Sequence, residues 1–152
     1  INESNQERQV APWEIIRVTN DGGLIFFDAL LDGITPAGLM NFKAEYGAVW
    51  YKTDETNENR KINADGKGWL AYANKGLLLV KKFDDLKPNQ PAPDEAEVQI
   101  YVNRGKAHIE LESQGAYTTL KPQEKLDWTV RWYLKPYEGE TVPSKQLLKM
   151  VK

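Results

Sequence analysis

The 152-residue sequence has no cysteine and a single histidine, His108. Without thiols the chain forms no disulfide, thiolate nucleophile or cysteine-ligated metal site, although an exported location stays open. Its 20 basic and 22 acidic residues nearly balance and form no basic block, so nothing indicates a nucleic-acid partner. No apolar run approaches the roughly 20 residues of a membrane-spanning helix, so we expect no membrane partner either.

Signals for common cofactors and catalytic machineries are also missing. The sequence contains no glycine-rich phosphate loop, nucleophile elbow or zinc-protease motif, and we expect no cofactor. It begins with Ile1 rather than Met, without a signal peptide. Such a start is expected of a processed or trimmed product or of a fragment, and we expect the chain to be part of a larger protein.

Short segments rich in β-branched and aromatic residues alternate with turn signals, which is typical of an all-β sandwich. Only 143–152 has a helical pattern, with Ser144 as its N-cap. Residues 1–9 are expected to be a flexible lead, 84–95 a proline-rich loop, and 137–152 a tail containing the short C-terminal helix. We predict a single all-β domain over 1–152, with strands at 11–20, 24–31, 48–52, 68–73, 76–83, 96–103, 106–113, 116–122 and 125–136.

The segment 106–113 alternates ionisable and apolar residues, so His108, Glu110 and Glu112 share one face of the predicted strand. We expect Arg104 and Gly105 to form the two-residue loop of a hairpin. The register counted from that loop gives three pairs on the polar face: Tyr101 with His108, Gln99 with Glu110, and Glu97 with Glu112. The opposite face predicts the core: Val98, Ile100, Val102, Ala107, Ile109 and Leu111.

This polar face has several interpretations. Its composition fits the solvent-exposed side of a sheet. However, Glu97 directly opposite Glu112 would be repulsive, and clustered carboxylates raise one another's pKa, as a general acid or base requires. The carboxylates could instead hold Ca²⁺ or Zn²⁺, but zinc usually takes more nitrogen or sulfur donors, and we expect no metal.

Other candidate contacts lie elsewhere in the chain. Trp13 is the best sugar-stacking surface among the five tryptophans, although their ordinary role is core packing. Lys81 lies in phase with apolar residues and needs a partner or a water-filled cleft, and a nearby carboxylate such as Glu110 is the expected partner. Arg17 can hydrogen-bond sugar hydroxyls. Four residues near the C-terminus share a face that we predict to be core: Trp128, Val130, Trp132 and Leu134.

Three longer stretches carry a resemblance: "APWEIIRV" (11–18), "GWLAYANKGLLLVKKF" (68–83) and "EVQIYVNRGKAHIELESQGAYTTLKPQEKLDWTVRWYL" (97–134). They are similar to the C-terminal half of galactose mutarotase-like (aldose epimerase-like) proteins, and within that superfamily to an uncharacterised bacterial branch. The likeness covers about residues 8–136. It implies a β-supersandwich, or a large part of one, with a concave sugar-binding face.

In aldose epimerases of that superfamily, which are isomerases, a late-strand Glu deprotonates the anomeric hydroxyl and a His protonates the ring oxygen. The family word "ElE" matches 110–112, so the resemblance implies Glu110 or Glu112 as the base, and we favour Glu110. The word "KrF" matches 81–83, and "vEvY" matches 97–101 with one extra residue before Tyr101. Two family residues are missing, a proline at Ala116 and a glycine at Gln123.

Full members of the superfamily are longer, and their catalytic histidines lie in an earlier segment that this chain lacks. The function therefore stays open between a carbohydrate-active enzyme, a non-catalytic sugar-binding module and a structural β-module of a larger exported bacterial protein. We expect a periplasmic or extracellular location rather than a cytoplasmic one. Half a supersandwich leaves long sheet edges, which we expect a second copy or a missing N-terminal half to cover.

Overall fold

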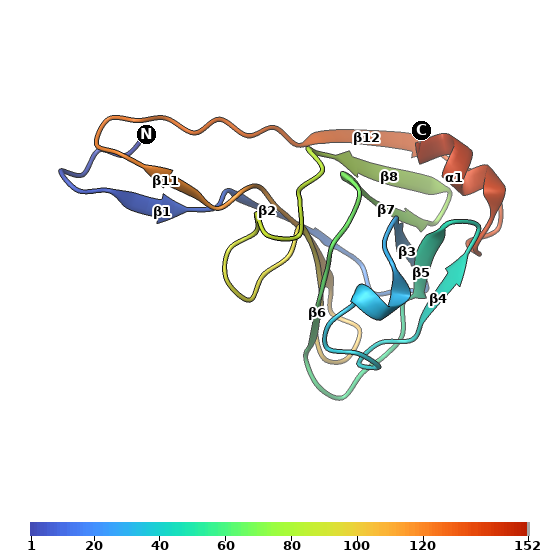
Figure 1. The fold of residues 1–152 in the computed structure, drawn as a ribbon. Helices are drawn as coiled ribbons and strands as arrows, with labels where there is room; N and C mark the ends of the chain where they lie inside the picture. The colour runs from blue at the N-terminus through green and yellow to red at the C-terminus, as the bar shows by residue number, and fades with distance from the viewer. Residues whose placement is uncertain (152) are drawn as a thin grey trace.

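The computed structural model describes residues 1–151 and is mostly β (Figure 1). A 3₁₀ helix, η1, covers Leu31–Gly33, and the short α-helix α1 covers Lys145–Val151. No helix within the described range is long and apolar enough to cross a membrane. The strands are β1 Arg8–Val10, β2 Trp13–Val18, β3 Leu24–Phe27, β4 Phe42–Glu45, β5 Ala48–Lys52, β6 Arg60–Ala64, β7 Trp69–Asn74, β8 Leu77–Lys82, β9 Val98–Val102, β10 Ile109–Gln114, β11 Thr118–Leu120 and β12 Arg131–Pro136.

Two antiparallel sheets pack face to face. The first has the strand order β2-β10-β9-β6 and the second the order β12-β8-β7-β3-β5-β4. Alternate residues of both sheets point into the space between them, as strand geometry requires. The five core positions predicted on β9 and β10 are confirmed, and they pack against the six-stranded sheet: Val98, Ile100, Val102, Ile109 and Leu111. Ala107, which was also predicted to be core, is exposed in the loop before β10.

The far face of the six-stranded sheet carries a second apolar cluster beneath α1. Phe26 and Trp50 stack there with their ring centroids 4.4 Å apart, and Leu147 and Val151 of α1 complete the cluster. The predicted N-cap is confirmed, because the Leu147 amide donates to Ser144 Oγ at 3.2 Å. The predicted helix also included Lys152, which lies outside the described residues.

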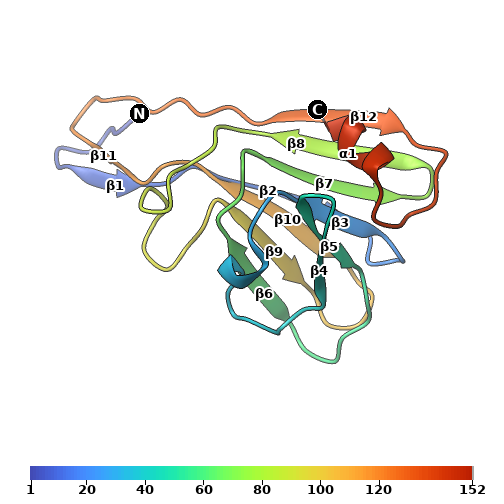
Figure 2. The ribbon, with the colours of Figure 1, turned by 45° about the vertical axis from the view of Figure 1, so that its right-hand side comes forward.

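Strands β1 and β11 form a two-stranded arm that projects from the sandwich (Figures 1 and 2). Asn2 is buried at its end, where its Nδ2 donates to the carbonyls of Gln6 and Leu120. The predicted lead at 1–9 therefore contains the start of β1 and a buried side chain.

The predicted hairpin around 104–105 has the wrong register. Four residues, 104–107, separate Asn103 from His108, whose carbonyl accepts the Asn103 amide. Glu110 consequently pairs with Tyr101 and Glu112 with Gln99. A shift of two residues keeps every side chain on its predicted face but changes its neighbours.

Other sequence predictions fail near the sheet edges. Strands β4 and β6 were not predicted, and the strand expected from residue 125 begins only at Arg131. Trp132 and Leu134 were predicted to be core, but they are 52% and 67% exposed. The four-stranded sheet has no strand opposite them, because β2 is its last strand on that side.

The β7–β8 hairpin turns at Lys75 and Gly76, one residue later than predicted, and both have positive φ, 46° and 78°. A Cβ at Gly76 would meet nothing closer than the Tyr137 carbonyl at 3.9 Å. Gly76→Ala is therefore expected to act through backbone strain alone, lowering the free energy of unfolding by about 1 kcal/mol. Denaturant melts measure this loss, and Gly33→Ala, with equal space and no positive φ, should cost less than about 0.5 kcal/mol. Equal costs for the two variants would contradict the strain argument.

Candidate functional site

The polar row predicted from the sequence lies on the outer side of the four-stranded sheet. We call this surface the acid–base face. Its inward neighbours, such as Ile109 and Leu111, are core residues, so the alternate residues necessarily point away from the sandwich. The acid–base face consists of Trp13 and Arg17 on β2, Glu110 and Glu112 on β10, Gln99 and Tyr101 on β9, Lys61 on β6, and His108 just before β10.

Glu110 makes the contacts at one end of this face. Arg17, its cross-strand neighbour on β2, donates from Nε to Glu110 Oε1 at 2.8 Å. His108 Nε2 lies 3.6 Å from the same oxygen, and its ring is tilted toward Tyr101 at 6.4 Å between centroids. The structure thus places Arg17, which the sequence reasoning did not assign to this row, beside Glu110, His108 and Tyr101.

Glu112 is the buried acid of the face, with only 1% of its surface exposed. Lys61 Nζ lies 3.2 Å from Glu112 Oε2. Burial raises the pKa of the Glu112 carboxyl above its ordinary value and the nearby charge of Glu110 adds to this, while Lys61 and Trp13 oppose the shift. Desolvation rather than repulsion between the acids is therefore the main cause.

Lys61 is the member of the face that sequence reasoning missed. Its Cα pairs with Tyr101 on β9, yet its ammonium reaches Glu112 on β10 and lies 5.0 Å from the centroid of the Trp13 ring on β2. Its chain therefore crosses β9 and joins three strands. The alternation of Ile62 and Ala64 with polar residues in "RKINA" was the signal for this strand.

Glu97 does not belong to the acid–base face. Its carboxylate accepts the amides of Gly68 at 2.9 Å and Leu86 at 2.5 Å, and its backbone carbonyl accepts the Gln114 amide. Burial raises its pKa, and the two backbone amides oppose this shift. The predicted pair of Glu97 with Glu112 is wrong, and Glu97 instead holds the segment that follows β8 against the sheet.

Lys81 lies on the inner side of the sandwich, and its predicted partner is also wrong. The ammonium is fully buried and contacts Glu14 Oε2 at 2.5 Å rather than Glu110. It also donates to the Leu111 carbonyl at 2.7 Å, and Ser113 Oγ donates to Glu14 Oε2 at 3.0 Å. Burial lowers the pKa of Lys81, and the carboxylate of Glu14 opposes this shift. This cluster connects the two sheets and does not reach the acid–base face.

The chemistry available on the acid–base face is hydrogen bonding beside an exposed aromatic ring. Trp13 is 53% exposed, and charges of both signs lie next to it. Glu110 is on β10 and His108 lies just before that strand, so the imidazole and the carboxylate are neighbours and do not approach a ligand from opposite sides. Within residues 1–151 no group of three or more acidic or histidine side chains is arranged to hold a metal ion.

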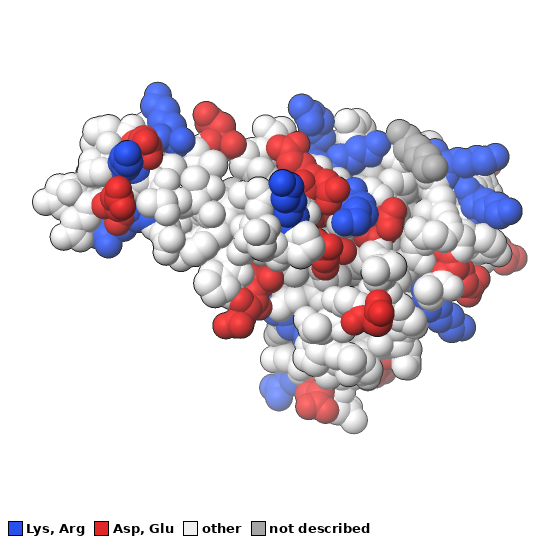
Figure 3. Space-filling model, in the orientation of Figure 1, with Lys and Arg blue, Asp and Glu red and all other residues white. Residues whose placement is uncertain are grey.

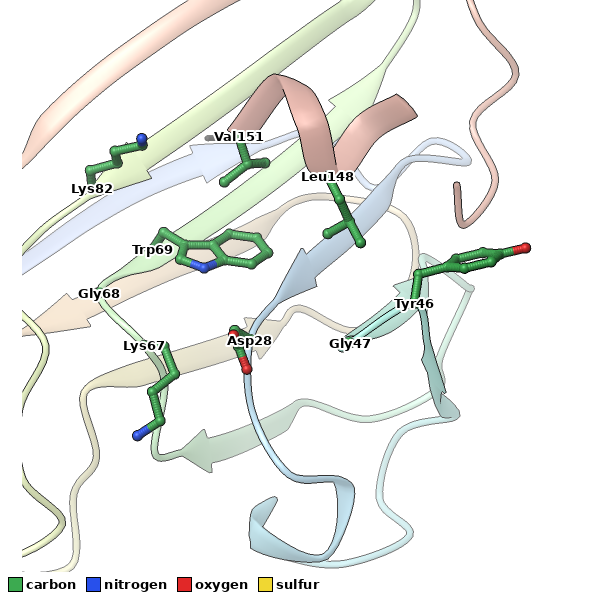
Figure 4. Close-up of a pocket in the computed structure, with 9 residues that line it drawn as sticks. All are labelled: Asp28, Tyr46, Gly47, Lys67, Gly68, Trp69, Lys82, Leu148 and Val151. Atoms are coloured by element: carbon green, nitrogen blue, oxygen red, sulfur yellow. The ribbon is translucent and has the colours of Figure 1, made fainter. Parts of the chain in front are cut away.

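A separate hollow of about 510 Å³ lies beneath α1, and we call it the α1 pocket (Figure 4). Leu148 and Val151 of α1 point into it from above, and the Trp69 indole lies below them. Asp28, just after β3, provides a half-buried carboxylate at its lower side. Sequence reasoning did not predict this pocket, because its walls come from segments far apart in the chain.

The chain matches no protein-family model, no curated protein and no solved structure.

Glu112→Gln gives a prediction about pH. Because the folded-state pKa of Glu112 is raised, the folded chain keeps a proton that the unfolded chain releases near the ordinary value of 4.5. The free energy of unfolding that this proton contributes to the wild type is therefore lost as the pH rises from the ordinary value toward the higher folded-state pKa. Relative to wild type, Glu112→Gln should therefore gain free energy of unfolding as the pH rises above the ordinary carboxyl value of 4.5. Thr118→Ser, which removes no titrating group, should parallel wild type in the same denaturant melts, and a constant difference for Glu112→Gln would contradict the assignment.

Proposed function

We propose that the acid–base face recognises a carbohydrate unit. The observation that carries this proposal is the exposed indole of Trp13, at one end of a row of hydrogen-bonding groups that includes Lys61, Glu112, Glu110 and Arg17. The apolar C–H face of a pyranose can lie on the indole, while hydroxyls exchange hydrogen bonds with carboxylates and cations. The resemblance to galactose mutarotase-like proteins supports the same ligand class and the supersandwich fold.

Binding without turnover fits the contacts better than isomerisation. A mutarotase reaction needs a base at the anomeric hydroxyl and an acid at the ring oxygen, each within hydrogen-bond reach. Glu110 already accepts from Arg17 at 2.8 Å, and Glu112 is buried beside Lys61. His108 lies next to Glu110 rather than across a ligand from it. If a further segment supplied the acid, Glu112 would be the better base, since its pKa is raised.

The matched tryptophans Trp13 and Trp132 provide the test. They are equally exposed, at 53% and 52%, but Trp132 is on β12 of the other sheet. We expect saturable binding of at least one member of a monosaccharide panel in NMR titrations. Trp13→Ala should weaken that binding at least about 10-fold, equivalent to about 1.4 kcal/mol, while Trp132→Ala should leave it unchanged.

Asp28→Asn adds a third arm that locates the sugar. This variant removes the one acidic group among the described residues that line the α1 pocket and does not change any residue of the acid–base face. Loss of binding in Asp28→Asn with no change in Trp13→Ala would move the site to the α1 pocket. That outcome, or the absence of binding to every sugar in the panel, would overturn the proposal.

A further inference from the structure

One side of the sandwich is open. A groove of about 520 Å³ lies between β2 of the four-stranded sheet and the neighbouring strands β8 and β12 of the six-stranded sheet. Its walls are mainly apolar side chains that include Ile16, Val18, Leu79, Trp132 and Leu134. These residues lie on the inner faces of their sheets, which are dry core elsewhere in the molecule.

Large apolar side chains are exposed at this groove. Leu77, Trp132 and Leu134 are 47%, 52% and 67% exposed, and all three line it. Soluble domains seldom leave large apolar side chains grouped at the surface unless another molecule covers them. The groove therefore has the composition of an interface rather than of a solvated surface.

The strands on both sides of the groove have a free edge. Within the described chain, β12 pairs only with β8, and β2 pairs only with β10. An edge strand presents unpaired backbone N–H and C=O groups in a row. An added strand satisfies such groups through main-chain hydrogen bonds, while its alternate side chains enter pockets. The occupant that fits both the edge and the groove is an extended polypeptide.

The charges on β12 restrict the sequence of that strand. On the side away from the groove β12 presents Arg131, Tyr133 and Lys135, and basic side chains lie over β12 and around α1 in Figure 3. Among the described residues the Arg131 side chain has no ion-pair or hydrogen-bond partner, while Lys135 Nζ donates to the Met150 carbonyl of α1 at 2.5 Å. Opposite charges directly across a strand pair are favourable and like charges are not.

We propose that β12 accepts an antiparallel strand from a different protein, with apolar residues opposite Trp132 and Leu134 and acidic residues opposite Arg131 and Lys135. The apolar residues fill the groove, and the acidic residues pair with the cations on the outer side. The pattern along the partner is acidic, apolar, any residue, apolar, acidic. This proposal does not depend on the sugar-binding function.

A second copy of this chain fits the edge less well. In an antiparallel pair of two β12 strands centred on Tyr133, Arg131 of each copy faces Lys135 of the other. Such like-charge pairs are destabilising, and Lys82 lies 5.9 Å from the Tyr133 ring on the same side. The charge pattern therefore favours a partner of different sequence.

The test uses the synthetic peptide acetyl-Thr-Glu-Val-Thr-Val-Glu-Thr-amide and the full 152-residue chain. We expect saturable binding with a Kd of about 1 mM or below. In ¹⁵N NMR spectra the Trp132 indole should shift and the β12 amides should exchange more slowly. Two N-methylated versions, each blocking the amides of one peptide edge, separate main-chain pairing from apolar contact. Only the version blocked on the edge that faces β12 should lose binding.

A charge swap provides the matched control. A peptide with Lys in place of both Glu residues should bind wild type at least about 10-fold more weakly, and Arg131→Glu should recover part of that loss. The proposal is overturned if the Glu peptide shows no saturable binding, if both N-methylated versions bind equally, or if the two charge forms bind alike. It is also overturned if the peptide-free protein dimerises in sedimentation experiments with slowed exchange at β12, because a second copy then occupies the edge.

Discussion

A buried ammonium group fixes how the two sheets lie on one another. Lys81 projects from β8 into the space between them, where its Nζ contacts Glu14 on β2 and the Leu111 carbonyl on β10. A fully buried cation is costly unless it is paired and hydrogen-bonded. Both partners belong to the four-stranded sheet, so this requirement holds the β2 side of that sheet against β8. Apolar packing alone would permit neighbouring arrangements of similar burial.

The surfaces of the molecule follow from that arrangement. With Glu14 pointing inward, its neighbours Trp13 and Ile15 on β2 must point outward, which places the indole on the acid–base face. The same connection leaves Ile16 and Val18 facing the open groove. The sugar-binding proposal therefore concerns the outer face of β2. The strand-binding proposal concerns β12 and the groove that the inner face of β2 lines, so the two can be tested separately.

The sequence predicted which side of the sheet a side chain points to better than it predicted which residues lie opposite it on the neighbouring strand. Strict alternation in 106–113 identified which side of β10 is polar, and this survives a register shift of two residues. The residue pairs between β9 and β10 depended on the length of the loop that joins these strands. In that loop Gly105 has a φ of 73° and forms a β-bridge with Thr56, almost fifty residues away in the sequence. Lys61 was missed because β6 has only two inward apolar residues among polar ones.

Long-range pairing accounts for the remaining errors. The pattern around Lys81 required a partner, but the choice of Glu14 over Glu110 depends on which side of the four-stranded sheet faces inward. The apolar face of Trp132 and Leu134 was visible in the sequence, whereas the missing strand opposite it was not. A local sequence pattern shows that a side chain needs an ion-pair partner or an apolar cover. The order of the strands in the sheets determines whether another part of the chain provides that partner or cover.

The measurement that tests this account most directly is a double-mutant cycle on the buried pair, with Lys81→Met, Glu14→Gln and the double variant in denaturant melts. If the ammonium fixes the sheets through Glu14, Lys81→Met should cost about 3–5 kcal/mol, because it leaves the carboxylate without its cation. Glu14→Gln should cost about 2 kcal/mol or more, because it leaves the buried ammonium without its counter-ion. The double variant should be no less stable than Lys81→Met, so the coupling energy is at least the cost of Glu14→Gln, about 2 kcal/mol or more. Single effects that add to within about 0.5 kcal/mol would show that the two side chains are independent and would contradict the account.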